Sequence, residues 1–106
     1  MIEVLNLNEV VEYKQDSISS KTLVEKEGGS LTVYAFDKAQ GLGKHTSPSI
    51  TTIQLVEGKV EITIDGKTEL LREYDLVTVP ADTPFSLHSI QKVKVAVFRV
   101  SHLSKK

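Results

Sequence analysis

The sequence contains no cysteine among its 106 residues. Without cysteine, neither a disulfide framework nor a thiolate metal site can form. A chain of this length buries roughly two-thirds of the surface that its unfolded form exposes, which is enough for one core without covalent or metal staples. We therefore expect one domain that spans residues 1–106.

The sequence also lacks an excess of charge of either sign and any long apolar run. Its 13 basic and 14 acidic residues are spread along the chain, without the basic cluster that binds phosphates, so nucleic acid is not an expected partner. No apolar run approaches the roughly 20 residues that cross a bilayer. Met1–Val4 does not resemble a secretion signal. We expect a cytoplasmic protein that does not bind membranes.

What the sequence does contain is apolar alternation with a period of two, which is typical of β-strands. Val60–Ile64 and Val93–Phe98 alternate in this way, which predicts strands with one buried face. Ile50–Val56 is more continuously apolar, as expected for a strand that is covered on both sides. About nine short strands at this close spacing predict an all-β sandwich or barrel.

Short turn motifs separate these strands. Asp65-Gly66 joins two of them and suits a type I′ hairpin, in which both central residues have positive φ. Gly28-Gly29 is expected to form the same kind of turn, and Glu57-Gly58 a third tight connection.

Two expectations concern the ends of the chain. Asn6 followed three residues later by Glu9 fits a capping box, which predicts one short N-terminal helical turn. Near the other end, Lys92, Lys94 and Arg99 are expected to form a solvated strand edge, where charge discourages unwanted pairing.

The stretch Gly41–Ser89 resembles the two-motif core of the cupin family. His45, Gly58 and Pro80 match motif positions, and the hairpin between the two motifs is present. Tyr74 and Asp82 stand where the family has turn glycines. The resemblance implies a cupin double-stranded β-helix, a jelly-roll-like barrel of the small type-2 conserved kind, with its motif core at residues 41–89.

Many cupins hold a divalent metal through two histidines and a glutamate of the first motif and a histidine of the second. Carried onto this sequence, the four positions hold His45, Ser47, Thr51 and Phe85. A catalytic metal needs about three protein ligands, and only the imidazole of His45 is a competent one. We therefore expect a degenerate metal site and no cofactor. His88 and His102 are expected to face solvent and not to replace the missing ligands.

The same four residues are the candidate ligand-binding residues, and each also has a structural interpretation. His45 can bond a ligand or transfer a proton, or it can be a polar side chain satisfied by a neighbour or water. The hydroxyls of Ser47 and Thr51 can line a pocket or bond to nearby backbone. Phe85 can support a flat ligand or fill the space that a metal site would occupy.

Three functions stay open at this point. The first is a metal-free barrel that binds a small organic ligand or a protein partner. The second is a metal-dependent enzyme, dioxygenase-like or isomerase-like, that uses His45 with unforeseen ligands. The third is a metal-free catalyst with His45 as general base, although no activated partner is visible. Whether the protein is an enzyme is uncertain, because one barrel fold hosts many functions.

The family resemblance also implies a homodimer. Small cupins commonly pair through their sheets, and Ile2–Leu5 could add a strand to a neighbouring copy.

Overall fold

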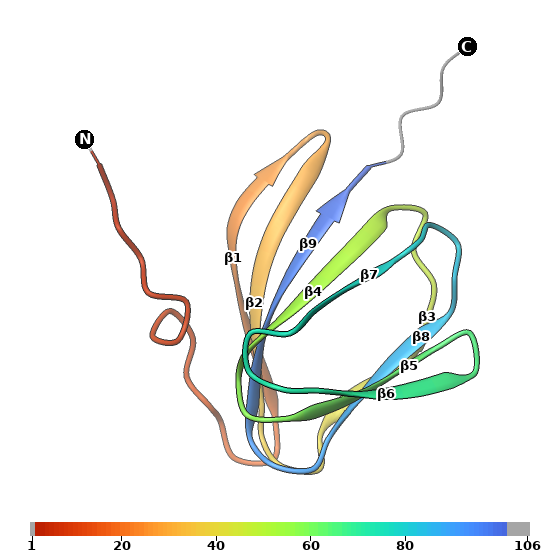
Figure 1. Cartoon of the computed structure of the whole chain (residues 1–106). Helices are drawn as coiled ribbons and strands as arrows, with labels where there is room; N and C mark the ends of the chain where they lie inside the picture. The colour runs from red at the N-terminus through yellow and green to blue at the C-terminus, as the bar shows by residue number, and fades with distance from the viewer. Residues whose placement is uncertain (1, 102–106) are drawn as a thin grey trace.

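The computed structural model describes residues 2–101, and these residues form nine β-strands and no helix. A five-stranded sheet has the order β1-β2-β9-β4-β7, and a four-stranded sheet has the order β3-β8-β5-β6 (Figure 1). The strands are β1 (Ile18–Lys26), β2 (Gly29–Phe36), β3 (Gly41–His45), β4 (Ile50–Glu57), β5 (Val60–Ile64), β6 (Lys67–Leu71), β7 (Leu76–Val79), β8 (Phe85–Ser89) and β9 (Val93–Val100).

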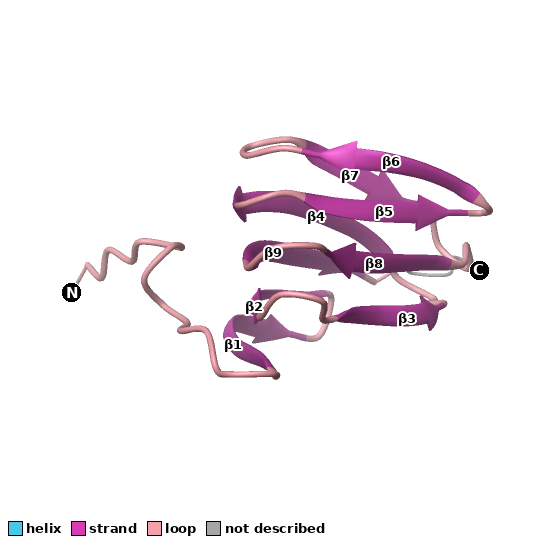
Figure 2. Cartoon of the chain, turned by 90° about the horizontal axis from the view of Figure 1, so that it is seen from below, coloured by secondary structure: helices cyan, strands magenta, loops and turns pink. Residues whose placement is uncertain are grey.

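The two sheets lie face to face, and every paired strand is antiparallel (Figure 2). From β3 to β9 the chain passes repeatedly from one sheet to the other, so that β6 and β7 come to the same edge of the stack. The all-β barrel expected from the alternation is confirmed. Residues 2–101 contain no helix long and apolar enough to cross a membrane.

The core lies between the sheets because alternate residues of each strand point to one face. On β4 the inward positions are Thr51, Ile53 and Leu55, all buried. Ile53 and Leu55 meet inward residues of the opposite sheet. The buried cluster comprises Phe36, Ile53, Leu55, Val60, Ile62, Leu71, Val79, Phe85, Leu87, Val93, Val95 and Val97.

A second apolar cluster covers the outer face of the five-stranded sheet. The N-terminal segment, residues 7–13, packs there against buried Val33, Ala35 and Ala96. The expected solvated edge is therefore wrong at Lys94, which is only 7% exposed. β9 lies between β2 and β4 and is buried on both faces, because the N-terminal segment covers the side that alternation alone assigns to solvent.

The expected N-terminal helical turn is not a helix. The Asn6 side chain accepts a hydrogen bond from the Asn8 amide at 2.9 Å, and the Asn6 carbonyl accepts one from the Glu9 amide at 2.9 Å. These bonds close a single turn, and a short helix has too few bonds to offset its nucleation cost. Leu7 and Val10 pack on the sheet instead.

Two of the predicted turns compare with the structure as follows: one lies at its predicted residues, and the other is shifted by one residue. Asp65 and Gly66 have φ of 50° and 85°, as a type I′ turn requires. In the first hairpin the turn residues are Glu27 and Gly28, one position earlier than expected, because Gly29 already pairs with Lys26 and with Val100.

The two positions that replace turn glycines keep the left-handed backbone. Tyr74 has a φ of 73° and Asp82 a φ of 61°. The Tyr74 amide donates to the Leu55 carbonyl at 2.8 Å, which holds the turn while the aromatic side chain stays exposed. The glycine-type turn is thus conserved in conformation without glycine.

Candidate functional site

A β-bulge in β3 decides which side chain of that strand enters the barrel. Leu42 pairs with Leu87 and His45 pairs with Phe85, so β3 contains one residue more than β8 between these pairs. Directly paired residues share a face of the sheet. Without the extra residue, Lys44 would stand opposite Phe85 and would point inward in place of His45.

His45 and Phe85 consequently touch at one end of the barrel. Their ring centroids are 5.3 Å apart with an interplanar angle of 83°, an edge-to-face contact. Phe85 is buried, whereas His45 stays exposed at the end of β3. The imidazole therefore combines an apolar support with access from solvent.

The other histidines do not join this site in the described residues. Phe85 and Leu87 point inward on β8 and His88 is exposed, as expected from the period of two. His102 lies outside the described residues.

Ser47 is half-buried in the loop between β3 and β4. Its hydroxyl oxygen accepts a hydrogen bond from the Ser49 amide at 3.1 Å, and its carbonyl accepts one from the Asp82 amide at 2.7 Å. These contacts tie the two loops at this end of the barrel together. The hydroxyl proton of Ser47 remains available for a further acceptor.

Thr51 differs from the other hydroxyl residues of the barrel. It lies on the inner face of β4, is 1% exposed, and its Oγ1 is the one buried side-chain oxygen or nitrogen of residues 2–101 without a hydrogen-bond partner. Its neighbour Thr52 points to the other face and shares a 3.0 Å bond with Thr78. An unpartnered buried hydroxyl costs about 1–3 kcal/mol, so the Thr51 hydroxyl lowers the stability of the described fold as long as it lacks a partner.

The four expected ligand positions do not fit a metal. The imidazole of His45 is the only strong donor among them, since neutral hydroxyls bind transition metals poorly and Phe85 offers no donor. Over residues 2–101, no three His, Asp or Glu side chains gather as a metal site would need.

A groove of about 600 Å³ opens between the sheets at the edge formed by β6 and β7. Its volume falls within the range of roughly 300–1,000 Å³ of small-molecule sites. It adjoins the predicted site without being lined by it: Ile64 is the register partner of Phe85, and Val77 lies two residues before Val79, the partner of Thr51. The lining residues are Ile62, Ile64, Asp65, Lys67, Glu69, Leu70, Leu71, Asp75, Leu76 and Val77.

This groove was not predicted from the sequence. Glu69 pairs with Ile62 and Lys67 pairs with Ile64, so both charged side chains share the inner face with Leu71. Charged residues at the same alternate positions as a buried residue indicate a strand whose inner face is partly open to solvent. This alternation is visible in the sequence Lys67–Leu71, but the position of the strand at the edge of its sheet is not.

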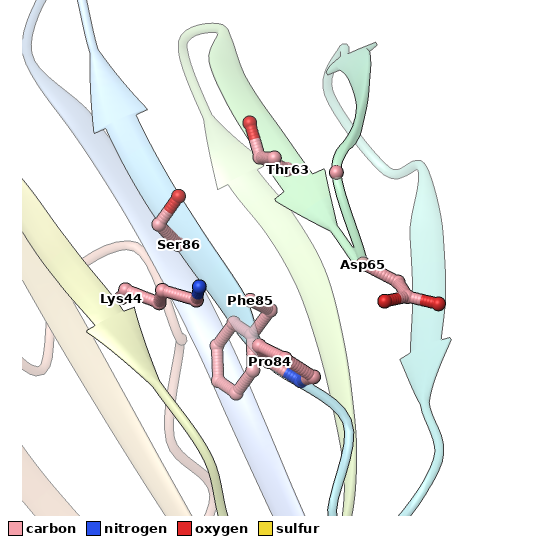
Figure 3. A pocket seen from close by; sticks show the side chains of 7 residues that line it. Lys44, Thr63, Asp65, Pro84, Phe85 and Ser86 are labelled. Atoms are coloured by element: carbon pink, nitrogen blue, oxygen red, sulfur yellow. The ribbon is translucent and has the colours of Figure 1, made fainter.

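A second, smaller pocket of about 210 Å³ lies beside β3, β8 and β5. Figure 3 shows Lys44, Ser86 and Thr63 around it, and the Asp65 carboxylate directed away from the Lys44 amine. Thr63 bonds to Thr68 at 2.8 Å, so its hydroxyl already has a partner.

The architecture and the motif positions now permit comparison with known proteins. Residues 25–101 match the family described as the EutQ-like cupin domain. The chain belongs to this cupin family. A comparison with curated proteins finds no match for this cupin.

Solved structures give the same fold. A conserved protein of unknown function from Streptococcus pyogenes is 31% identical, with a TM-score of 0.90 over 98% of this chain and 91% of that one. A cupin 2 conserved barrel domain protein from Leptotrichia buccalis is 28% identical, with a TM-score of 0.88 over 92% of this chain and 47% of that one. A cupin superfamily protein from Desulfitobacterium hafniense, 17% identical, has a TM-score of 0.90 over 96% and 94% of the two chains.

Proposed function

We propose that this cupin binds a small organic molecule between its sheets without a metal, through His45, Ser47, Thr51 and Phe85. The observation that carries the proposal is the buried Thr51 hydroxyl, which has no partner. A bound molecule that reaches this hydroxyl would supply the missing hydrogen bond. The groove of about 600 Å³ would give such a molecule room and an approach from solvent, because Val77 on its lining lies two residues before Val79, the partner of Thr51.

His45 and Phe85 give the site a second recognition element. The edge-on contact between their rings holds the imidazole at the barrel end, where it can donate to or accept from a polar group. The side-chain donors favour binding of an organic molecule over a metal-dependent reaction. One imidazole and two neutral hydroxyls do not supply the three ligands that a catalytic metal needs.

The first test is elemental analysis of protein purified without chelator or nickel resin. We expect less than stoichiometric iron, manganese, zinc and nickel. Near-stoichiometric metal would contradict the proposal and favour the metal-dependent alternative.

The second test is a titration of ¹⁵N-labelled protein with hexanol, followed by amide chemical shifts. We expect the largest shifts at Thr51, Ile64 and Phe85, with little change at Thr52. A His45→Ala variant should weaken binding several-fold, whereas His88→Ala, a matched change on the outward face, should not. Shifts confined to other surfaces, or equal effects of the two histidine changes, would sink the proposal.

We further propose that the cupin assembles as a homodimer through its N-terminal end. Ile2 and Val4 are 90% and 88% exposed, and Figure 1 shows the N-terminal end of the chain standing apart from both sheets. Apolar side chains in this position would be covered if the segment joined a second copy. Light scattering should give a dimer mass for the full chain and a monomer mass after deletion of residues 2–5. A monomeric full chain would refute this assembly.

A further inference from the structure

The groove at the β6–β7 edge has an apolar floor and a charged rim. Ile62, Ile64, Leu71 and Val77 form the floor, and all four belong to the central apolar core or pack against it. Apolar side chains of this kind favour a hydrocarbon body by about 25 cal/mol for each Å² removed from water.

The rim has an imbalance of charge. Three acidic residues, Asp65, Glu69 and Asp75, line the groove, and Lys67 is the one cationic residue among the lining residues. Asp75 also accepts a 2.9 Å hydrogen bond from the Arg72 amide, which fixes its carboxylate at the start of β7. The lining therefore carries more negative than positive charge beside an apolar cavity.

We infer that the groove binds a small amphiphilic cation, with its apolar body on the floor and a protonated amine at the carboxylate rim. This inference rests on the proposed binding function and names the chemical class of its ligand. The register of β6 gives the main contact, because Glu69 lies opposite Ile62 on the inner face. An amine at Glu69 thus leaves its hydrocarbon chain directly over the apolar floor.

Charge at the rim selects the head group more than it adds affinity. A single exposed ion pair strengthens binding about 1.4-fold to fivefold, and an anionic head group would in addition be repelled by the other carboxylates. Together these effects predict a preference for an amine over a carboxylate of the same chain length on the order of tenfold at low salt. Added salt should reduce the preference, because the rim is exposed to solvent.

The test compares hexylamine, hexanol and hexanoate, which share a hydrocarbon chain and differ in head group. Dissociation constants come from titrations of ¹⁵N-labelled protein at low and high salt. We expect hexylamine to bind most tightly, hexanol less tightly and hexanoate most weakly. The amine should add shifts at the groove residues Ile62, Leu71 and Val77 to those that hexanol causes at Thr51, Ile64 and Phe85. Hexanoate binding as tightly as hexylamine would overturn the inferred ligand class while leaving the proposed function standing. No binding of any of the three between the sheets would sink the proposed function itself.

A matched pair of variants locates the effect at the rim. Glu69→Gln should weaken hexylamine binding about threefold to fivefold and leave hexanol unchanged. Glu61→Gln makes the same charge change on β5, where the side chain alternates with inward Val60 and Ile62 and faces outward. The Glu61→Gln change should leave the affinity for both hexylamine and hexanol unchanged. Equal effects of the two variants would show that overall charge, and not the groove, selects the amine.

Discussion

The two sides of the barrel treat buried polar groups differently. On the outer face of the five-stranded sheet, which the N-terminal segment covers, the buried Lys94 amine donates to the Asn8 carbonyl and lies 5.0 Å from the centre of the Tyr13 ring. On the inner face of the same sheet, the Thr51 hydroxyl of β4 is buried without any partner, and the open groove lies at the edge strand β7, which pairs with β4.

This difference separates a structural polar group from a candidate functional one. A buried charge is tolerated when the protein itself supplies its partners, and Lys94 meets that condition. A buried hydroxyl without a partner lowers the stability of the fold and makes no stabilising interaction in it. We therefore attribute stability to the covered outer face, the closed side of the barrel, and propose the inner face beside the groove, the open side, for binding.

The largest effect is expected on the closed side, from Lys94→Met. The change removes a hydrogen bond from a charged donor and a cation–π contact, which should lower the free energy of unfolding by about 2 kcal/mol. Urea denaturation measures this loss. Lys92→Met is the matched control, because Lys92 also lies over the Tyr13 ring, at 5.4 Å, but is exposed. A loss as large for Lys92→Met would remove the special role of Lys94.

A smaller effect is expected from Tyr13→Phe, which removes a 3.2 Å hydrogen bond to Glu57 and should cost about 1 kcal/mol. Burial, the Glu57 charge and this hydrogen bond together raise the pKa of Tyr13. A raised pKa stabilises the fold below the unfolded-state value of about 10, and that contribution is lost as the pH rises further. Denaturation series above pH about 10 should therefore fall more steeply for the wild type than for Tyr13→Phe. Parallel curves would contradict this assignment.

Much of the fold was predictable from local sequence, for identifiable reasons. Alternation along Val60–Ile64 and the Asp65-Gly66 turn report on backbone geometry that each segment imposes by itself. The burial of Lys94 was not predictable, because it depends on residues 7–13 reaching the outer face from the far end of the chain. The failed capping box at Asn6 has the same cause, since tertiary packing of Leu7 and Val10 overrode a local preference.

The candidate site divides along the same line. The cupin motif positions predicted Thr51 and Phe85 as site residues, and the structure places both on inner faces of the sheets. The inward position of His45 depends on a bulge, and the groove depends on β6 and β7 both being edge strands. Neither the inward position of His45 nor the groove can be predicted from the sequence of a single segment. Only the pairing of strands shows which charged residues meet an apolar cavity.

The most direct measurement compares Thr51→Val with Thr52→Val by urea denaturation of the ligand-free protein. The two residues are neighbours on β4, and each change replaces a hydroxyl with a methyl group. Because the Thr51 hydroxyl is unpartnered and the Thr52 hydroxyl bonds to Thr78, Thr51→Val should raise the free energy of unfolding by about 1 kcal/mol and Thr52→Val should lower it by about 0.5 kcal/mol. A loss of stability for Thr51→Val equal to that for Thr52→Val would mean that the fold itself satisfies the inner hydroxyl, and the open side would lose its assignment to binding.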